Sequence, residues 1–304
     1  MGNFITKIMK AFANSSQCNT SYVVENEGDL LVVSVDDNEV SIDDVVIEEN
    51  NTIFTKNGNK MALLIGINYI SDSYKNNDLG GCVNDVINLQ KDLVDKMNFN
   101  GTNICTLINK DASKNNIIKE LEKLIIFSNS NENSEIWLSY SGHGGGKFSI
   151  KEADNQSEFI CPSDYKTNGL IHDSWLKENF VKKLHKSTKC FVLMDCCNSG
   201  SNINLPFCYN NKVDNKDHIE CDDSLCKIIK ISGSKDDQTS ADYYDRESQS
   251  YQGALSNSFL KTLTLEEDIL THYNELKKSL KVRRFTQVPD LTYSDSKLIN
   301  YKLF

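Results

Sequence analysis

The sequence predicts an α/β protein whose central sheet is mostly parallel and is covered by helices on both faces. Two observations support this fold class. Short apolar segments typical of buried strands alternate with longer segments in which apolar residues recur every three or four positions, as in amphipathic helices. The alternation continues from about residue 60 to residue 280, and strand–helix–strand crossovers build parallel sheets.

The predicted strands are short and apolar, and they occupy residues 61–67, 104–108, 135–140, 189–194 and 228–232. The predicted helices lie at residues 83–97, 114–127, 256–264 and 268–280. The longest run of apolar residues and glycine has seven residues, Met61 to Ile67, whereas a membrane-spanning helix needs about 20. The sequence therefore predicts no transmembrane helix.

Charge is distributed unevenly along the chain. The net charge of the 304 residues is −10, and residues 21–55 contain ten acids and no base. An acidic balance argues against a nucleic-acid partner, and we interpret the basic residues within 277–284 as a solvated helix face. Ten scattered cysteines without a preceding signal peptide favour a reducing, cytoplasmic location.

The N-terminal residues carry two further signals. Apolar residues within 4–12 have helical spacing, with Lys7 and Lys10 on the other side. Residues 1–6 fit the N-myristoylation pattern at Gly2, so we expect membrane association through the N-terminus at the cytoplasmic face. The β-branched runs within residues 21–54 are compatible with edge strands or with a loosely ordered pro-segment.

Two predicted strands end in glycine-flanked residues that can carry chemistry. One runs into Ser141-Gly142-His143-Gly144 and another into Asp195-Cys196-Cys197-Asn198. Strand ends of a parallel sheet share one edge, and an imidazole beside a thiol can take its proton. The pattern predicts a Cys–His nucleophilic site. Neither a phosphate-binding loop nor a zinc site fits these residues.

These motifs resemble the two active-site motifs of metacaspases, which are cysteine peptidases with a caspase-like fold. The resemblance continues in chain order through residues 62–69, 79–85, 160–164, 231–242, 253–256 and 287–291. The short connection between the two halves resembles that of type I metacaspases. The resemblance therefore implies a leader at 1–20, an acidic pro-segment at 21–58 and a caspase-like catalytic domain at 59–304. Within that domain it implies a large-subunit-like part to about 204, a surface connection at 205–225 and a small-subunit-like part at 226–304.

The resemblance also implies roles for individual residues. His143 would be the base and Cys197, rather than Cys196, the nucleophile, with the backbone N–H groups of Gly144 and Cys197 as oxyanion donors. Asp85 and Asp195 would bind the Arg or Lys side chain of a protein or peptide substrate. Cys82 and Ser141 would line the same pocket.

Two departures from the family pattern affect these expectations. Asn198 stands where the family usually has His. The family's calcium cluster corresponds here to Glu158, Asp173, Ser174 and Asn204, with fewer acids than usual, and hard cations prefer charged oxygens. The resemblance implies no cofactor for the chemistry and Ca²⁺ as a weak activator at most.

We therefore expect a monomeric endopeptidase that cleaves after Arg or Lys and processes itself. Lysines at 56, 60, 212, 216 and 227 lie near the expected boundaries of the leader and the surface connection. One alternative is a catalytically silent, membrane-anchored regulatory homologue. Another is an Asp-specific caspase, which would need basic residues that the two active-site motifs lack.

Overall fold

The computed structural model describes residues 7–10, 19–26, 29–36, 52–70, 78–148, 156–196, 205–209, 225–233 and 242–303. The chain divides into two compact units, Met1–Asn51 and Thr52–Phe304. All predicted site residues except Gly2 belong to the second unit.

The first unit contains a three-stranded antiparallel sheet in the order β1-β2-β3. Its strands are β1 (Lys7–Lys10), β2 (Asn19–Asn26) and β3 (Asp29–Asp36). The helix expected from the spacing within residues 4–12 is therefore wrong at Lys7–Lys10, which pair with residues 22–25 of β2. A short isolated helix is marginal in water, whereas the β-branched residues of β2 favour strand pairing.

The second unit is built on a seven-stranded sheet in the order β11-β15-β12-β10-β6-β4-β5. The strands are β11 (Phe207–Cys208), β15 (Asp290–Tyr293), β12 (Lys227–Ser232), β10 (Lys189–Asp195), β6 (Glu135–Ser141), β4 (Lys60–Gly66) and β5 (Ile104–Ile108). The strands from β12 to β5 are parallel, and β15 and β11 add antiparallel pairs at one edge. The mostly parallel sheet is thus confirmed, and each predicted strand has its counterpart in it.

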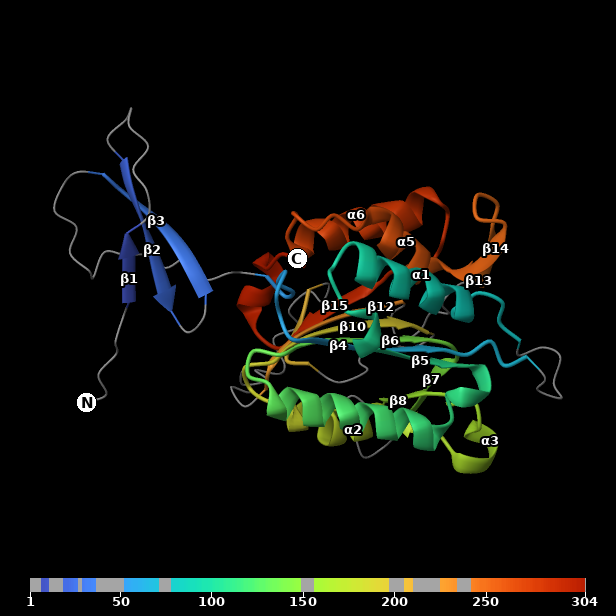
Figure 1. Ribbon diagram of the computed structural model, residues 1–304. Helices are drawn as coiled ribbons and strands as arrows, with labels where there is room; N and C mark the ends of the chain where they lie inside the picture. Colours follow the sequence, from blue (N-terminus) through green and yellow to red (C-terminus); the bar gives the residue numbers. More distant parts are fainter. Residues whose placement is uncertain are drawn as a thin grey trace. The chain divides into compact units, whose positions relative to one another are not determined.

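Helices cover both faces of this sheet, as predicted (Figure 1). One layer contains α1 (Cys82–Asp95), α5 (Ala254–Thr262) and α6 (Ile269–Val282). The opposite layer contains α2 (Lys114–Ser130), α3 (Tyr165–Asn168) and α4 (Asp173–Asn179). No helix in the described part of the chain is long and apolar enough to cross a membrane.

Two small antiparallel sheets lie beside the main one, and the sequence pattern did not predict them. The first contains β7 (Gly144–Phe148), β8 (Gln156–Ile160) and β9 (Ile171–His172), and the second contains β13 (Asp242–Asp245) and β14 (Ser250–Gly253). β7 includes three glycines, which are poor strand formers. Its pairing with β8 supplies the stability that its own residues lack.

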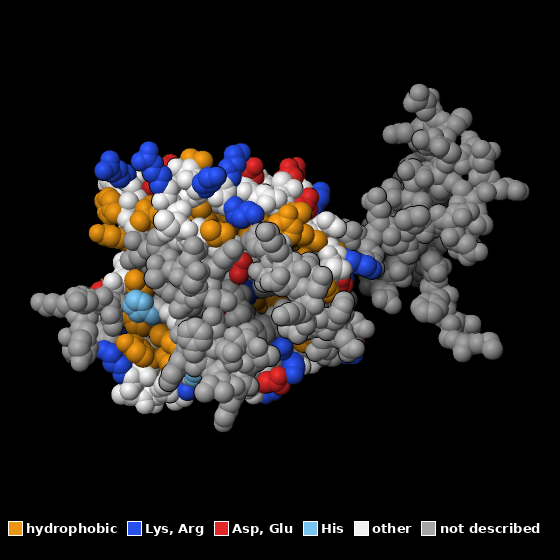
Figure 2. Space-filling view, turned by 180° about the vertical axis from the view of Figure 1, so that it is seen from behind, with side chains coloured by type: hydrophobic (Ala, Val, Ile, Leu, Met, Phe, Trp, Pro, Cys, Tyr) orange, Lys and Arg blue, Asp and Glu red, His pale blue; other side chains and the backbone are white. Residues whose placement is uncertain are grey.

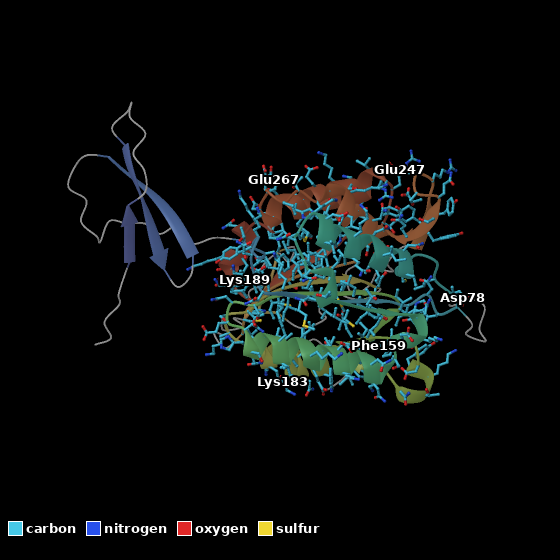
Figure 3. The ribbon with its side chains drawn as sticks, in the orientation of Figure 1. Asp78, Phe159, Lys183, Lys189, Glu247 and Glu267 are labelled. Carbon is cyan, nitrogen blue, oxygen red and sulfur yellow. The ribbon has the colours of Figure 1, made fainter. Side chains whose placement is uncertain are left out.

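Side chains of each central strand alternate between two apolar cores. Ile229 and Ile231 of β12 join the core under α1, α5 and α6, together with Trp137. Ile228 of the same strand and Val192 of β10 belong to the core under α2 and α4. In Figure 3, Lys189 at the start of β10 lies at one end of the sheet, and Asp78 and Glu247 lie at the other. The carboxyl ends of the parallel strands point to this second end.

Part of the basic segment at 277–284 has a structural role, which corrects the interpretation of a fully solvated face. Figure 2 shows Lys and Arg side chains along the top of the second unit, over the layer of α1, α5 and α6. Arg283 at the end of α6, however, is half-buried and donates hydrogen bonds to Asn257, Ser258 and Tyr243. The Lys277 ammonium lies 4.7 Å from the centroid of the Tyr273 ring. The hydrogen bonds of Arg283 tie the end of α6 to α5 and β13, whereas the Lys277 contact lies within α6.

The cysteines that the structure describes are all free thiols, at positions 82, 105, 161, 190, 196, 208 and 226. Burial raises the pKa of Cys226 to about 12 and also raises that of Cys190, so these two core thiols stay protonated and inert.

A buried histidine on α6 makes the stability of the second unit depend on pH. His272 is 2% exposed, and burial lowers its pKa from 6.5 to about 4. In the unfolded chain the same imidazole titrates near its ordinary pKa. Between about pH 6.5 and pH 4 the unfolded state therefore binds more protons, and stability falls as the pH falls.

We expect this group to remove about 3 kcal/mol from the free energy of unfolding between neutral pH and about pH 4. Urea unfolding at both pH values measures it. His272→Leu should lose less stability over this interval than the wild type, whereas His172→Gln, which changes an exposed histidine, should behave like the wild type. Equal pH dependence in His272→Leu and wild type would contradict the expectation.

Candidate active site

The ends of three parallel strands lie side by side and form the base of the site. Gly66 of β4 pairs with Ser141 of β6, which pairs with Asp195 of β10. The ladder continues past the strand ends, because the Gly142 N–H donates to the Asp195 carbonyl over 3.3 Å. The two glycine-flanked motifs therefore begin on neighbouring strands, which is the condition under which their His and Cys residues can meet.

His143 follows β6 directly, and its backbone is held by tyrosines and a neighbouring loop. Its N–H donates to the Tyr69 hydroxyl (3.1 Å), and its carbonyl accepts from the Tyr140 hydroxyl (2.7 Å) and from the Cys161 N–H (3.0 Å). Burial raises the pKa of both tyrosine hydroxyls well above 10, so both remain protonated donors. The imidazole is partly exposed, which leaves it accessible to a substrate.

The Tyr69 ring also packs against the imidazole, with ring centroids 4.4 Å apart. Tyr69 has a positive φ of 56°, a left-handed conformation that costs a non-glycine residue roughly 1–3 kcal/mol. Its hydroxyl donates to the Cys161 carbonyl over 2.5 Å. This network of hydrogen bonds over-determines the conformation and fixes the ring beside His143.

The thiol side of the predicted dyad is described as far as Cys196. Cys196 is 0% exposed and belongs to the core under α2 and α4, so its sulfur cannot reach a bound substrate. Cys197 and Asn198 lie outside the described residues. The predicted lipidation site Gly2 and the predicted calcium ligand Asn204 also lie outside them.

The four predicted specificity residues come together beside the strand ends. Cys82 and Asp85 are supplied by the first turn of α1, Ser141 by the end of β6 and Asp195 by the end of β10. Each is about 5% exposed. The Ser141 hydroxyl donates to Oδ2 of Asp85 over 2.6 Å, so the contact between α1 and β6 includes this hydrogen bond.

Gly253 at the start of α5 lies between the two carboxylates. Its N–H donates to Oδ1 of Asp85 over 2.9 Å, and the Ser256 N–H donates to Oδ2 of Asp195 over 2.8 Å. A methyl group on Gly253 would lie 2.3 Å from Oδ2 of Asp195 and 2.6 Å from Oδ2 of Asp85. The two acids therefore face the same point, and a helix N-terminus favours negative charge there.

Gly144, the predicted oxyanion donor, is the first residue of β7 and pairs with Ile160 of β8. The β7–β8 hairpin thus extends directly from His143. Gly142 also has a packing requirement, because a methyl group there would lie 2.7 Å from the Tyr140 hydroxyl.

The predicted calcium ligands Glu158 and Asp173 are both 0% exposed. Phe159 of β8 pairs with His172, the last residue of β9, and Glu158 and Asp173 are their direct sequence neighbours. The ammonium of Lys230 interacts electrostatically with Glu158. Among the described residues, no three His, Cys, Asp or Glu side chains are grouped so that they could hold a metal ion. Calcium binding at Glu158 and Asp173 therefore stays a prediction.

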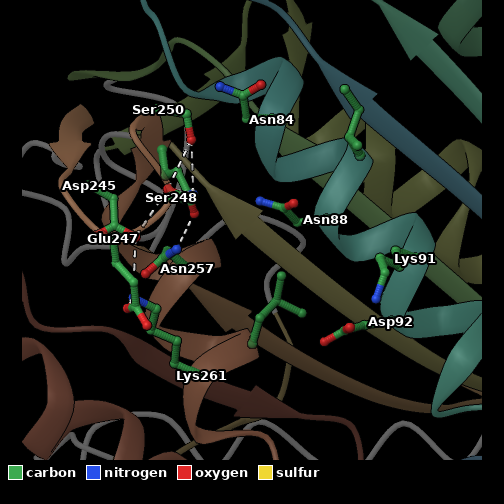
Figure 4. A pocket seen from close by; sticks show the side chains of 13 residues that line it. Asn84, Asn88, Lys91, Asp92, Asp245, Glu247, Ser248, Ser250, Asn257 and Lys261 are labelled. Atoms are coloured by element: carbon green, nitrogen blue, oxygen red, sulfur yellow. Dashed lines mark hydrogen bonds and ion pairs between the residues drawn. The ribbon is translucent and has the colours of Figure 1, made fainter.

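A polar groove of about 530 Å³ lies between α1 and the β13–β14 hairpin (Figure 4). Asn84 and Asn88 line it from α1, and Ser248, Asn257 and Lys261 line it from the opposite wall. None of the predicted site residues lines this groove. Two of its lining residues, Asn84 and Gln252, directly precede Asp85 and Gly253 in the sequence.

Two residues of the site, Tyr69 and Gly253, have a role that the sequence did not predict. Both fall within the motifs that carry the family resemblance. Their positions next to a strand end and a helix start were the available signal.

Comparisons with known proteins find the same family that the active-site motifs resemble. Residues 60–206 match the family described as Metacaspase, peptidase C14 domain. Metacaspase-1 of Eremothecium gossypii is 28% identical over 298 residues, which cover 78% of this chain and 64% of the relative. Metacaspase-1 of Saccharomyces cerevisiae is 27% identical over 296 residues, which cover 78% of this chain and 67% of the relative. The chain thus spans about two thirds of the length of these relatives.

A crystal structure of a protein from Geobacter sulfurreducens has the same fold. It superposes with a TM-score of 0.58 at 19% identity, over 80% of this chain and 97% of that chain.

The convergence on Gly253 leads to a test of the site's packing. Gly253→Ala should lower the free energy of unfolding by about 1–3 kcal/mol, the usual cost of overpacking. The backbone φ of −69° suits alanine, so the cost comes from the clash with two hydrogen-bonded carboxylates. Gly101→Ala is the matched control, because no atom lies within 4 Å of the position that its methyl group would take. Urea unfolding of both variants measures the difference, and equal stability would contradict the packing described.

Proposed function

The chain belongs to the metacaspase family of cysteine peptidases, and from this premise we propose that it hydrolyses peptide bonds after Arg or Lys through His143 and Cys197. The observation that carries the specificity is the convergence of the buried acids Asp85 and Asp195 on Gly253. Protein and peptide chains with an accessible Arg or Lys are the proposed substrates.

The proposed chemistry uses the imidazole and one thiol. His143 takes the proton from the Cys197 thiol, and the thiolate attacks the carbonyl carbon of the scissile bond. The imidazolium then protonates the leaving amine, which leaves a thioester. Water, deprotonated by the same imidazole, hydrolyses the thioester and restores the thiol. Held by Tyr69, Tyr140 and the Cys161 amide, the His143 backbone gives the imidazole a fixed point of attachment.

The tetrahedral intermediate carries a negative oxygen, which needs fixed donors. We assign this role to the backbone N–H groups of Gly144 and Cys197. Gly144 supports the assignment because it directly follows His143 and begins a paired strand, so the donor and the base belong to one anchored segment.

Electrostatics favours a basic substrate side chain over an acidic one. Two carboxylates with about 5% exposure attract a guanidinium or ammonium and repel a carboxylate. The Asp-specific alternative is therefore disfavoured. The silent regulatory alternative rests on Asn198, and the hydrolysis assays below distinguish it.

The proposed reaction requires no cofactor, because a thiol and an imidazole supply both nucleophile and acid–base chemistry. Calcium as an activator finds little support in Glu158 and Asp173, because the described residues contain no group of three His, Cys, Asp or Glu side chains that could hold a metal ion.

We also propose self-processing and N-terminal membrane attachment. Lys56 is exposed in a loop before β4, which suits cleavage, whereas Lys60 is 4% exposed and faces Glu135. Cleavage after Lys60 is therefore disfavoured. Lys212 and Lys216 lie outside the described residues. Myristoylation at Gly2 would attach a cytoplasmic, monomeric enzyme to a membrane until such cleavage releases it.

The dyad is tested by single substitutions. Cys197→Ala and His143→Ala should each abolish hydrolysis of a fluorogenic Arg-peptide, because the nucleophile or its base is lost. Cys196→Ala should retain most activity, since its sulfur is buried. An Arg-peptide affinity label followed by mass spectrometry should modify Cys197. Full activity in Cys197→Ala would refute the assignment, and hydrolysis by none of the proteins would favour the silent homologue.

The specificity acids are tested by charge removal. Asp85→Asn and Asp195→Asn should each lower kcat/KM for Arg-peptides by an amount equivalent to about 2–5 kcal/mol, the scale of truncating one partner of a buried charge pair. Asp95→Asn, which alters an exposed acid on the same helix, serves as the control and should not change kcat/KM. Unchanged kcat/KM in both pocket variants would show that specificity depends on other residues.

A further inference from the structure

Tyr69, shortly after β4, has a backbone conformation that is unfavourable for tyrosine. Its φ is 56°, in the left-handed region that glycine and asparagine enter more readily than other residues. Such outliers persist where surrounding contacts hold them, and they cluster at functional sites. The strain at Tyr69 therefore indicates that its side chain is needed where it lies.

The main chain around Tyr69 is fixed on two sides. The Ile67 N–H donates to the Ser141 carbonyl over 3.0 Å, which continues the pairing of β4 with β6. The side-chain Oδ1 of Asn68 accepts from the Val83 N–H in the first turn of α1 over 3.1 Å. Tyr69 therefore has a defined position relative to β6, which leads to the base, and relative to α1, which carries one specificity acid.

The Tyr69 ring lies against the imidazole of His143. The ring centroids are 4.4 Å apart and the ring planes are inclined by 34°. Tyr69 is 7% exposed and belongs to the core under α2 and α4, and the Tyr165 ring meets the Tyr69 ring edge to face at 6.3 Å. Because the Tyr69 ring is supported in this way, it blocks rotation of the imidazole toward it and limits the orientations that the imidazole can adopt.

The hydroxyl and the ring of Tyr69 act on different parts of His143. The hydroxyl accepts from the His143 N–H over 3.1 Å and donates to the Cys161 carbonyl over 2.5 Å, so it holds the main chain. The ring contacts the side chain. Substitution can separate the two effects, because phenylalanine keeps the ring and lacks the hydroxyl.

The ring contact should strengthen during the proposed reaction. The imidazole gains a proton when the thiol attacks, and an aromatic ring attracts a cation that lies within about 6 Å of its centroid. An interaction that strengthens in the transition state raises kcat. The specificity acids converge on Gly253 and bind the substrate side chain in the proposed reaction, so loss of the Tyr69 ring should leave KM almost unchanged.

We propose that Tyr69 is a positioning residue for the base, whose ring holds the His143 imidazole in one orientation throughout hydrolysis. This inference rests on the proposed peptidase function and adds a residue to its site. The left-handed backbone directs the ring toward the imidazole, and the anchored residues before Tyr69 keep it there.

The test compares Tyr69→Leu, which removes the ring and the hydroxyl, with Tyr69→Phe, which removes the hydroxyl alone. Tyr293→Leu is the matched control. Tyr293 is 8% exposed and stacks on Phe207 with ring centroids 5.6 Å apart, but it pairs with Ile229 toward the start of β12, away from the strand ends that form the site. Each protein is assayed with an Arg-peptide for kcat and KM and is melted by circular dichroism.

Tyr69→Leu should lower kcat by roughly 10–100-fold, the scale of a misplaced catalytic group, with little change in KM. Tyr69→Phe should lose less of kcat, because the ring remains. Tyr293→Leu should melt at a lower temperature than the wild type, as Tyr69→Leu does, but keep the wild-type kcat. A merely structural role of Tyr69 would give the two leucine variants the same kcat.

NMR of protein with isotope-labelled histidine tests the ring contact without turnover. The ring current of Tyr69 should displace the imidazole C–H resonances of His143 from the values of a solvated histidine. The loss of these resonances in His143→Ala identifies them. The displacement should remain in Tyr69→Phe and disappear in Tyr69→Leu.

Equal kcat in Tyr69→Leu and the wild type would overturn the proposal. So would a loss of kcat in Tyr69→Phe as large as that in Tyr69→Leu, or undisplaced His143 resonances in the wild type. Tyr69→Asn, which suits the positive φ, replaces Tyr69→Leu if that variant does not fold. Absence of hydrolysis in every protein would refute the peptidase function, while the NMR shifts would still decide whether Tyr69 holds the imidazole.

Discussion

The candidate site depends on the register of three parallel strands. The last residues of β4, β6 and β10 lie side by side, and they are Gly66, Ser141 and Asp195. The segments that follow these strands therefore begin next to one another at the same edge of the sheet. A shift of one residue would turn every side chain of a strand to the opposite face. It would move Asp195 away from Gly253 and Cys196 out of the core. The apolar residues on both faces of these strands hold that register, and the chemistry of the edge follows from it.

Because Asp85 and Asp195 are buried, their carboxylates can attract a basic side chain more strongly than exposed acids would. In water, Asp85 and Asp195 would be ordinary solvated carboxylates, whereas at about 5% exposure they lose most of their hydration. Backbone amides and the Ser141 hydroxyl replace part of it, and the start of α5 adds a favourable dipole. A basic substrate side chain would contribute a full positive charge at the same point. The proposed specificity for Arg or Lys and the stability of the pocket thus have one electrostatic origin.

The sequence predicts much of this architecture because apolar periodicity reports burial. The strands at 104–108, 135–140 and 189–194 and the helices between them need no information beyond their own residues. β7 and β14 could not be predicted in this way, because glycines and polar residues form strands there only through their partners. At residues 7–10 the local pattern predicts the wrong element. The apolar residues there have helical spacing, but the segment forms a strand because it pairs with β2. Local pattern alone does not include such contacts, and the hydrogen-bond partners of Tyr69 are unpredictable for the same reason.

Asp195 ends the strand that leads to the predicted nucleophile, Asp85 lies beside it, and their proposed positive charge comes from outside the chain. This charge arrives with the substrate, so it is present only when there is a bond to cleave. The Gly253 and Ser256 N–H groups and the Ser141 hydroxyl already donate hydrogen bonds to the two carboxylates, which offsets part of the cost of burying them. These acids therefore suit recognition, where the gain in free energy should accompany binding.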